Sequence, residues 1–212
     1  MNSLRYAVYV SGSGTNIKKV LQRKINLISK IKIIITDNAN IELEELCKQK
    51  NIKYKLYVHE DTVRNKSESF SDYLLTHLIG NKIDFCFSFG TCILKGKLLE
   101  IYKNKIINFH PSLLPHFAGL NAIDKAIESN VKIIGNTAHF IDENIDTGPI
   151  ILQNVVHVEN FLNNGYEVIL EEQIVLMEKI DILLTEDRLH VIDNKVLIDN
   201  ANYTKSNIYP DI

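Results

Sequence analysis

Short runs of apolar and β-branched residues alternate with longer amphipathic runs along the first half of the chain. The short runs predict strands at residues 6–10, 31–36, 54–58, 85–89 and 106–110. The longer runs predict helices at residues 16–28, 42–49, 69–78 and 95–102. Elements that alternate in this way form right-handed β-α-β units. The pattern therefore predicts an α/β fold, with a Rossmann-like, mostly parallel twisted sheet and helices on both faces.

The second half of the chain has a different order of elements. Residues 121–128 predict a helix, and residues 133–140 and 150–157 predict two strands joined only by a loop. That order indicates a hairpin-like excursion at the edge of the sheet. Residues 166–184 predict a long helix, and residues 189–192 and 196–198 predict a small C-terminal hairpin. We expect a single domain over residues 1–200 and a polar C-terminal tail over residues 201–212.

Composition narrows the class of protein. The 212 residues carry a formal net charge of −2, which favours neither nucleic acid nor an anionic membrane as a partner. Cys47, Cys86 and Cys92 match no zinc spacing, so we expect no metal, no disulfide framework and a cytoplasmic location. No run approaches the roughly 20 apolar residues that span a bilayer.

A first candidate motif closes the strand predicted at residues 106–110. Asn108 and His110 are two apart, so their side chains face the same way, and Pro111 ends the strand behind them. An amide can stabilise an oxyanion, and an imidazole can do the same or move a proton near neutral pH. The pair predicts acyl-type chemistry. The alternative, of equal weight for this pair alone, is that both side chains satisfy loop backbone groups.

A second motif places three acids, Asp142, Glu143 and Asp146, in the loop after the strand at residues 133–140. One carboxylate close to His110 would hold the imidazole ring in place. The sequence leaves open which acid does so, and an ordinary solvated loop is the alternative.

A third motif is the glycine loop at residues 11–16, between the first strand and the first helix. Backbone N–H groups at a helix start favour an anion such as phosphate. The loop is similar to a dinucleotide-binding fingerprint, but Ile17 stands where the third glycine belongs. Asp37, about 20 residues on, partly restores that interpretation. A plain tight turn is the other alternative.

Together these segments resemble the folate-dependent formyltransferases, and among them the branch that acts on glycinamide ribonucleotide. The resemblance runs over about residues 6–153, and it is carried by Asn-x-His-Pro-Ser-Leu-Leu-Pro at residues 108–115 and by the segments at 11–16 and 135–146. It implies that 10-formyltetrahydrofolate, as a co-substrate, gives its formyl group to an amine through a tetrahedral oxyanion, without a metal. It also implies small-molecule substrates and a monomer or homodimer.

The same resemblance implies a role for particular residues. The implied catalytic residues are Asn108, His110 and Asp146, with support from Ser112, Gly119 and His139. The implied phosphate-binding residues are Gly12, Ser13, Gly14, Thr15 and Asn16. The implied folate-binding residues are Thr91, Cys92, Ile93, Leu94, Ile141, Asp142, Glu143 and Asn144.

Some positions depart from the family pattern and keep alternatives open. Ala118 and Asn121 stand where the family usually carries a proline and a histidine, which keeps an amino-sugar nucleotide as a possible acceptor. Hydrolysis of formyltetrahydrofolate is a second alternative, although those hydrolases have an N-terminal regulatory domain that we expect this chain to lack. The altered loop at Thr91 and Cys92 suggests a non-catalytic folate-binding relative. A nicotinamide-dependent oxidoreductase that uses the glycine loop and Asp37 ranks low, because it leaves Asn108, His110 and Asp146 unexplained.

Overall fold

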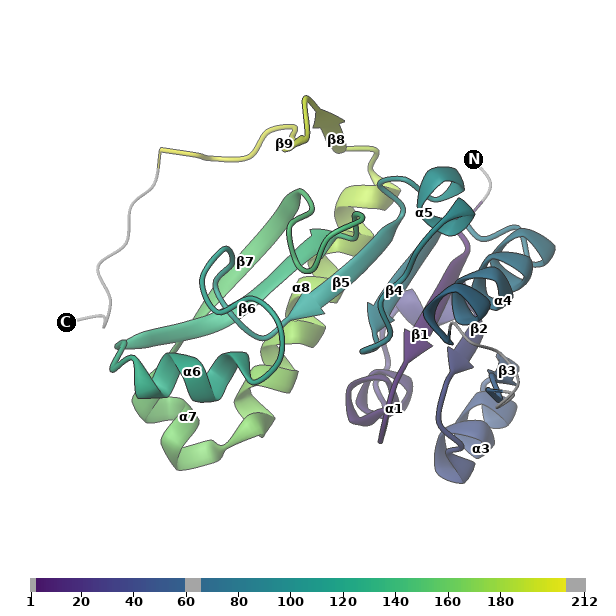
Figure 1. Ribbon diagram of the computed structural model, residues 1–212, viewed down its shortest axis with the longest axis horizontal. Helices are drawn as coiled ribbons and strands as arrows, with labels where there is room; N and C mark the ends of the chain where they lie inside the picture. Colours follow the sequence, from purple (N-terminus) through teal and green to yellow (C-terminus); the bar gives the residue numbers. More distant parts are fainter. Residues whose placement is uncertain (1–2, 60–65, 205–212) are drawn as a thin grey trace.

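The structure is a computed structural model that describes residues 3–59 and 66–204. The strands are β1 (Tyr6–Val10), β2 (Ile31–Thr36), β3 (Lys53–Leu56), β4 (Phe85–Phe89), β5 (Ile106–His110), β6 (Ile133–Phe140), β7 (Ile150–His157), β8 (Leu189–Ile192) and β9 (Lys195–Ile198). The helices are α1 (Thr15–Gln22), α2 (Leu27–Lys30), α3 (Ile41–Gln49), α4 (Lys66–Gly80), α5 (Lys97–Ile101), α6 (Ala122–Glu128), α7 (Val158–Asn164) and α8 (Tyr166–Thr185). Figure 1 shows their arrangement.

The main sheet has the order β3-β2-β1-β4-β5-β6-β7. Its first five strands in that order pair in parallel, and β6 and β7 add two antiparallel pairings at one edge. The strands β8 and β9 form a separate two-stranded antiparallel sheet. The predicted fold class, the edge excursion and the C-terminal hairpin are therefore confirmed.

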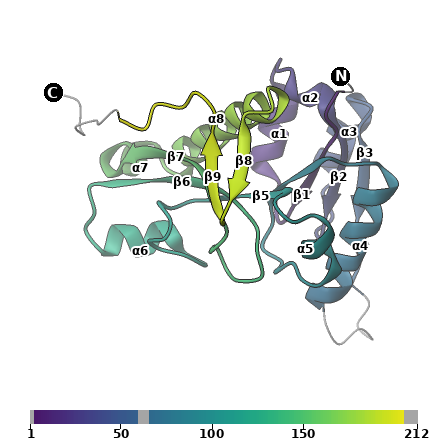
Figure 2. The same ribbon diagram turned by 90° about the horizontal axis from the view of Figure 1, so that it is seen from above.

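Helices cover both faces of the sheet because alternate strand residues point to opposite sides. In β1, Tyr6, Val8 and Val10 pack in one core cluster with α1, α3 and α8. Ala7 and Tyr9 pack in a second cluster with α4 and α5. Figure 2 shows α1 and α8 on one side of the sheet and α4 and α5 on the other. All five residues of β1 are buried, as expected for a central parallel strand.

Two details of the predicted helices are wrong. The helix predicted at residues 16–28 is two helices, because Arg23 takes an extended conformation (φ −81°, ψ 163°) and the chain turns before Leu27 packs into the core. The second error is the omission of α7, whose first N–H groups are capped when His157 accepts a hydrogen bond from the backbone of Glu159. The helix has only seven residues and buries only Phe161, so its periodic signal is weak.

The order of the strands determines where the loops at their carboxyl ends separate. From β1 the strands β2 and β3 follow on one side of the sheet, and β4 and β5 lie on the other. The order of the strands therefore reverses between β1 and β4. Loops that leave the carboxyl ends of strands on either side of such a switch point diverge and leave a crevice. Here those loops are residues 11–14 after β1 and residues 90–96 after β4.

Among the helices of the described residues, none has both the length and the apolar character that crossing a bilayer requires. Residues 205–212 of the expected tail lie outside the described residues.

The centre of the sheet offers a test of the fold. Phe87 on β4 is fully buried, and its ring lies 5.0 Å from Tyr6 and 6.0 Å from Phe109 between centroids. We expect Phe87→Ala to lower the free energy of unfolding by about 3–5 kcal/mol, because it leaves a cavity. Urea unfolding measures the change. Ile79→Ala, at a site that is 54% exposed, should stay within about 0.5 kcal/mol of the wild type, and equal effects of the two substitutions would contradict this packing.

Candidate functional site

A cavity of about 510 Å³ lies at the end of β5. Its walls come from the loop after β4, the end of β5, residues 119–122 and the loop between β6 and β7. Asn16 of α1 and Gln173 of α8 complete the lining. This volume is in the range of small-molecule sites.

Strand β5 presents Asn108 and His110 to the cavity. Antiparallel pairing with β6 places His139 directly opposite Asn108. Phe109 points to the other face, where its ring stacks on Phe89 at 4.8 Å between centroids. The prediction that Asn108 and His110 share one face is confirmed, since both side chains reach the group formed with His139 and Asp146.

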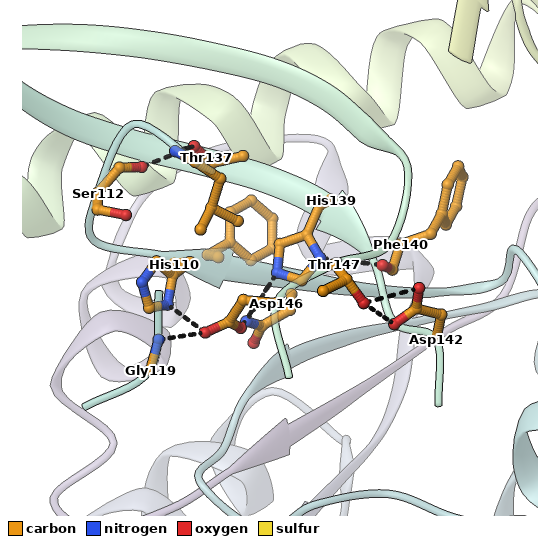
Figure 3. A network of polar contacts seen from close by, with 12 residues as sticks. His110, Ser112, Gly119, Thr137, His139, Phe140, Asp142, Asp146 and Thr147 are labelled. Atoms are coloured by element: carbon orange, nitrogen blue, oxygen red, sulfur yellow. Dashed lines mark hydrogen bonds and ion pairs between the residues drawn. The ribbon is translucent and has the colours of Figure 1, made fainter. Parts of the chain in front are cut away.

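The carboxylate of Asp146 joins these side chains (Figure 3). Its Oδ2 atom lies 3.3 Å from Nδ1 of His110 and accepts a hydrogen bond of 2.8 Å from the backbone N–H of Gly119. Its Oδ1 atom lies 3.5 Å from Nε2 of His139. The loop between β6 and β7 therefore places Asp146, among its three acids, against the histidines.

Hydrogen bonds to carbonyl groups fix where protons sit on the two imidazoles. A carbonyl only accepts, so Nε2 of His110 donates to the Phe117 carbonyl at 3.0 Å, and Nδ1 of His139 donates to the Phe140 carbonyl at 2.9 Å. Nε2 of His139 accepts from the Asn108 amide at 3.2 Å while the ring is neutral, and a proton added there would point to Asp146 instead. A proton on Nδ1 of His110 would turn its contact with Asp146 into a charge-assisted hydrogen bond.

The pKa of Asp146 reflects opposing effects. Burial raises it, but the hydrogen bonds from His139 and the Gly119 N–H, with the charges of His110 and His139, outweigh burial and hold the pKa below its ordinary value. The carboxylate is therefore ionised at neutral pH. It can take part in proton transfer and hold a neighbouring imidazolium.

A second acid of the same loop has a structural partner. Asp142 accepts hydrogen bonds from the hydroxyl of Thr147 at 2.8 Å and from the backbone N–H of Asn144 at 3.1 Å. These bonds fold the loop that carries Asp146. Asp142 also lines the cavity, so its use in the turn and its implied contact with folate are compatible.

Most of the residues singled out from the sequence meet at this cavity. Those that line it are Asn16, Thr91, Cys92, Ile93, Leu94, Asn108, His110, Gly119, His139, Ile141, Asp142, Asn144 and Asp146. Those outside its lining are Gly12, Ser13, Gly14, Thr15, Ser112 and Glu143. Ser112 is buried and donates to the His116 carbonyl at 2.7 Å, which holds the turn after β5.

The glycine loop has the backbone that its sequence predicts. Gly12 and Gly14 both have positive φ, 64° and 60°. Gly14 is the N-cap of α1, and an added Cβ there would lie 3.1 Å from Val10. Residues 13–16 thus form the start of a helix beside the cavity. The Oδ2 atom of Asp37 accepts hydrogen bonds from the hydroxyls of Tyr9 and Ser11.

Sequence reasoning missed Gln173. This amide is 96% buried on α8, lines the cavity and accepts a hydrogen bond from Asn16. A polar residue in the buried stripe of an amphipathic helix was the available signal, because Ile169 and Ile180 occupy the same stripe.

Comparison with known proteins decides the family. Residues 4–170 match the family model described as "Formyl transferase". The chain belongs to the formyl transferase family.

Individual formyl transferases and their relatives agree with this assignment. The phosphoribosylglycinamide formyltransferase of Bacillus subtilis is 30% identical over 158 residues, 73% of this chain and 80% of that protein. The formyltetrahydrofolate deformylase of Haemophilus influenzae is 34% identical over 167 residues, 74% of this chain and 56% of that protein. The crystal structure of glycinamide ribonucleotide transformylase 1 from Symbiobacterium toebii has a TM-score of 0.81 and 29% identity, and the match covers 92% of this chain and 93% of that one.

Metal ligands are a separate question for this formyl transferase. Within residues 3–59 and 66–204, no three His, Cys, Asp or Glu side chains are grouped so that they could hold a metal ion.

The pKa of Asp146 gives a prediction for stability. A carboxyl whose pKa is lowered by folding stabilises the fold above its unfolded pKa of about 3.9, and this contribution is lost as the pH falls through the folded pKa. We expect the difference in unfolding free energy between wild type and Asp146→Asn to shrink from about pH 5.5 to about pH 3. Urea unfolding at several pH values measures it. The exposed carboxyl variant Glu45→Gln should keep a constant difference, and a constant difference for Asp146→Asn as well would contradict the assignment.

Proposed function

We propose that this chain transfers the formyl group of 10-formyltetrahydrofolate to the amine of glycinamide ribonucleotide. The observation that carries the proposal is the contact between Asp146 and His110, at 3.3 Å, beside the Asn108 amide and on the wall of a ligand-sized cavity. An amide, an imidazole and a carboxylate around one centre are the groups that acyl transfer to an amine requires. Two of the relatives named above carry that activity in their names.

The reaction needs stabilisation of charge and movement of one proton. The amine nitrogen attacks the formyl carbon, and the formyl oxygen becomes an oxyanion. Asn108 and His110 donate hydrogen bonds to that oxyanion. The proton of the attacking amine passes towards Asp146, directly or through water, and a proton reaches the folate nitrogen as its bond to the formyl carbon breaks.

One contact must change before His110 can act in this way. Its Nε2–H is bound to the Phe117 carbonyl, and its Nδ1 faces Asp146. Donation to an oxyanion through Nε2 therefore requires an exchange of the Phe117 carbonyl for the substrate oxygen. Asn108 keeps a second amide proton beyond the one shared with His139.

The two substrates take different sides of the cavity in this proposal. The N–H groups of Gly12 to Asn16 at the start of α1 receive the phosphate of the acceptor. The loop of Thr91 to Leu94, with Ile141, Asp142 and Asn144, receives the folate. Gly12 to Thr15 lie outside the cavity lining, where a phosphate at the far end of the acceptor would lie.

Hydrolysis of the formyl donor is the second candidate. The 34% identity to a formyltetrahydrofolate deformylase favours it, because water in place of the amine would use the same three side chains. An amino-sugar nucleotide is a further candidate acceptor, because Ala118 and Asn121 depart from the family pattern. Asn121 lines the cavity.

A reducing cytoplasm is the compartment that we propose. Cys47, Cys86 and Cys92 are all free. Thiols without disulfides are usual in a reducing compartment.

One assay tests the proposed reaction. Purified protein receives 10-formyltetrahydrofolate with glycinamide ribonucleotide, with an amino-sugar nucleotide, or with no acceptor, and release of tetrahydrofolate is followed. We expect turnover only with the ribonucleotide. Turnover without an acceptor would identify a hydrolase, and turnover only with the sugar would replace the ribonucleotide as acceptor.

The role of His110 has its own test. We expect His110→Ala to lower kcat at least about 100-fold, as for loss of an oxyanion donor or general acid–base group, with the fold intact by circular dichroism. His190→Ala is a matched control, because His190 lies on the C-terminal hairpin and pairs with Asp199. A loss of less than about tenfold in His110→Ala would argue against a role in the chemical step.

A further inference from the structure

A hydrogen-bonded group under the switch point of the sheet is unused by the proposed chemistry. It consists of Tyr9 and Ser11 at the end of β1 and Asp37 after β2. Oδ2 of Asp37 accepts from the Tyr9 hydroxyl at 2.8 Å and from the Ser11 hydroxyl at 3.0 Å. The two hydroxyl oxygens are also 3.0 Å apart, so one hydroxyl can donate to the other while at least one proton points at the Asp37 carboxylate.

The hydroxyl oxygens of Tyr9 and Ser11 accept hydrogen bonds from the loop after β4. The backbone N–H of Thr91 donates to Ser11 Oγ at 3.0 Å, and the backbone N–H of Cys92 donates to Tyr9 Oη at 3.2 Å. A hydroxyl accepts well only when its proton points elsewhere. Asp37 is the charged acceptor of this hydroxyl pair, so it draws the hydroxyl protons away from the loop and leaves lone pairs of Ser11 and Tyr9 to accept from it.

The loop is also seated directly on the Tyr9 ring. A Cβ on Gly90 would lie 1.9 Å from the Tyr9 ring, so only glycine allows this approach. The same ring packs on Phe70, at 4.6 Å between centroids. Burial, together with Asp37, keeps the pKa of Tyr9 far above its ordinary value, so the phenol remains a proton donor.

The group links the two sides of the cavity. Ser11 is the first residue of the glycine loop, and Thr91 and Cys92 form part of the cavity wall. We propose that Asp37 is a positioning residue that, through Ser11 and Tyr9, makes binding of the phosphorylated amine strengthen binding of the folate. This inference rests on the proposed function, which assigns the amine to the glycine loop and the folate to the loop after β4.

The expected coupling is measurable without turnover. Tetrahydrofolate carries no formyl group, so it can bind together with glycinamide ribonucleotide without reacting. We expect the Kd of tetrahydrofolate to fall at least about fivefold when the ribonucleotide is saturating, the lower end of typical coupling between sites. Isothermal titration calorimetry under reducing conditions gives both values.

Asp37→Ala should bring the ratio of the two Kd values to within about twofold of one, because the hydroxyl protons lose their shared acceptor. Asp37→Asn should restore it, since an amide oxygen still accepts both hydrogen bonds. Glu45→Ala, which removes an exposed carboxylate from α3, should leave it unchanged. In turnover, Asp37→Ala should raise the KM for the folate and change kcat by less than about threefold, unlike His110→Ala.

The outcomes separate this inference from the proposed function. A wild type that transfers formyl to the ribonucleotide but has a Kd ratio of one overturns the inference alone, as does a folded Asp37→Ala with the wild-type ratio. If Asp37→Ala does not fold, Ser11→Ala removes the acceptor for Thr91, and an unchanged ratio in that variant also overturns it. A wild type without transfer overturns the proposed function and the inference together.

Discussion

A partly buried carboxylate, that of Asp146, is the constraint on which the site depends. It meets a backbone N–H from Gly119 and imidazole nitrogens from β5 and β6. Removing a carboxylate from water is unfavourable unless such partners compensate it. Segments that are far apart in the sequence therefore hold one arrangement around it, and the same contacts that stabilise the charge give His110 its orientation. Stability and chemistry share one set of interactions here.

The sheet explains why those partners are available. The antiparallel strand β6 beside β5 sets His139 directly across from Asn108. The reversal of strand order between β1 and β4 separates the loops that leave these two strands. Tyr9 and Ser11, which donate hydrogen bonds to Asp37, then connect these two loops. The proposed chemistry at β5 and the proposed binding at β1 and β4 would thus lie on neighbouring strands of one sheet.

Much of this arrangement follows from local sequence. Apolar β-branched runs defined β1, β2, β4, β5, β6 and β7 to the residue, because buried strands leave a strong and short-range signal. The prediction that Asn108 and His110 share one face followed from the two-residue period of a strand and from the proline that ends it. Non-local contacts were beyond the reach of the residue pattern: it left Asp146 and Asp142 undecided, so that only the family resemblance named Asp146, and it could not show the bond from the Gly119 N–H or turn Gln173 towards Asn16. The short helix α7 depends on a histidine cap, which periodicity does not register.

The division of the site along the chain has an evolutionary consequence. Asn108, His110, His139 and Asp146 all come from the segment that runs from β5 through β6 to the following loop, whereas the glycine loop and the loop after β4 come earlier. Substitutions in the glycine loop would therefore alter the proposed acceptor site while the four side chains of the later segment keep their geometry. A scaffold divided in this way can exchange one acceptor for another, water included, without rebuilding the cluster around Asp146.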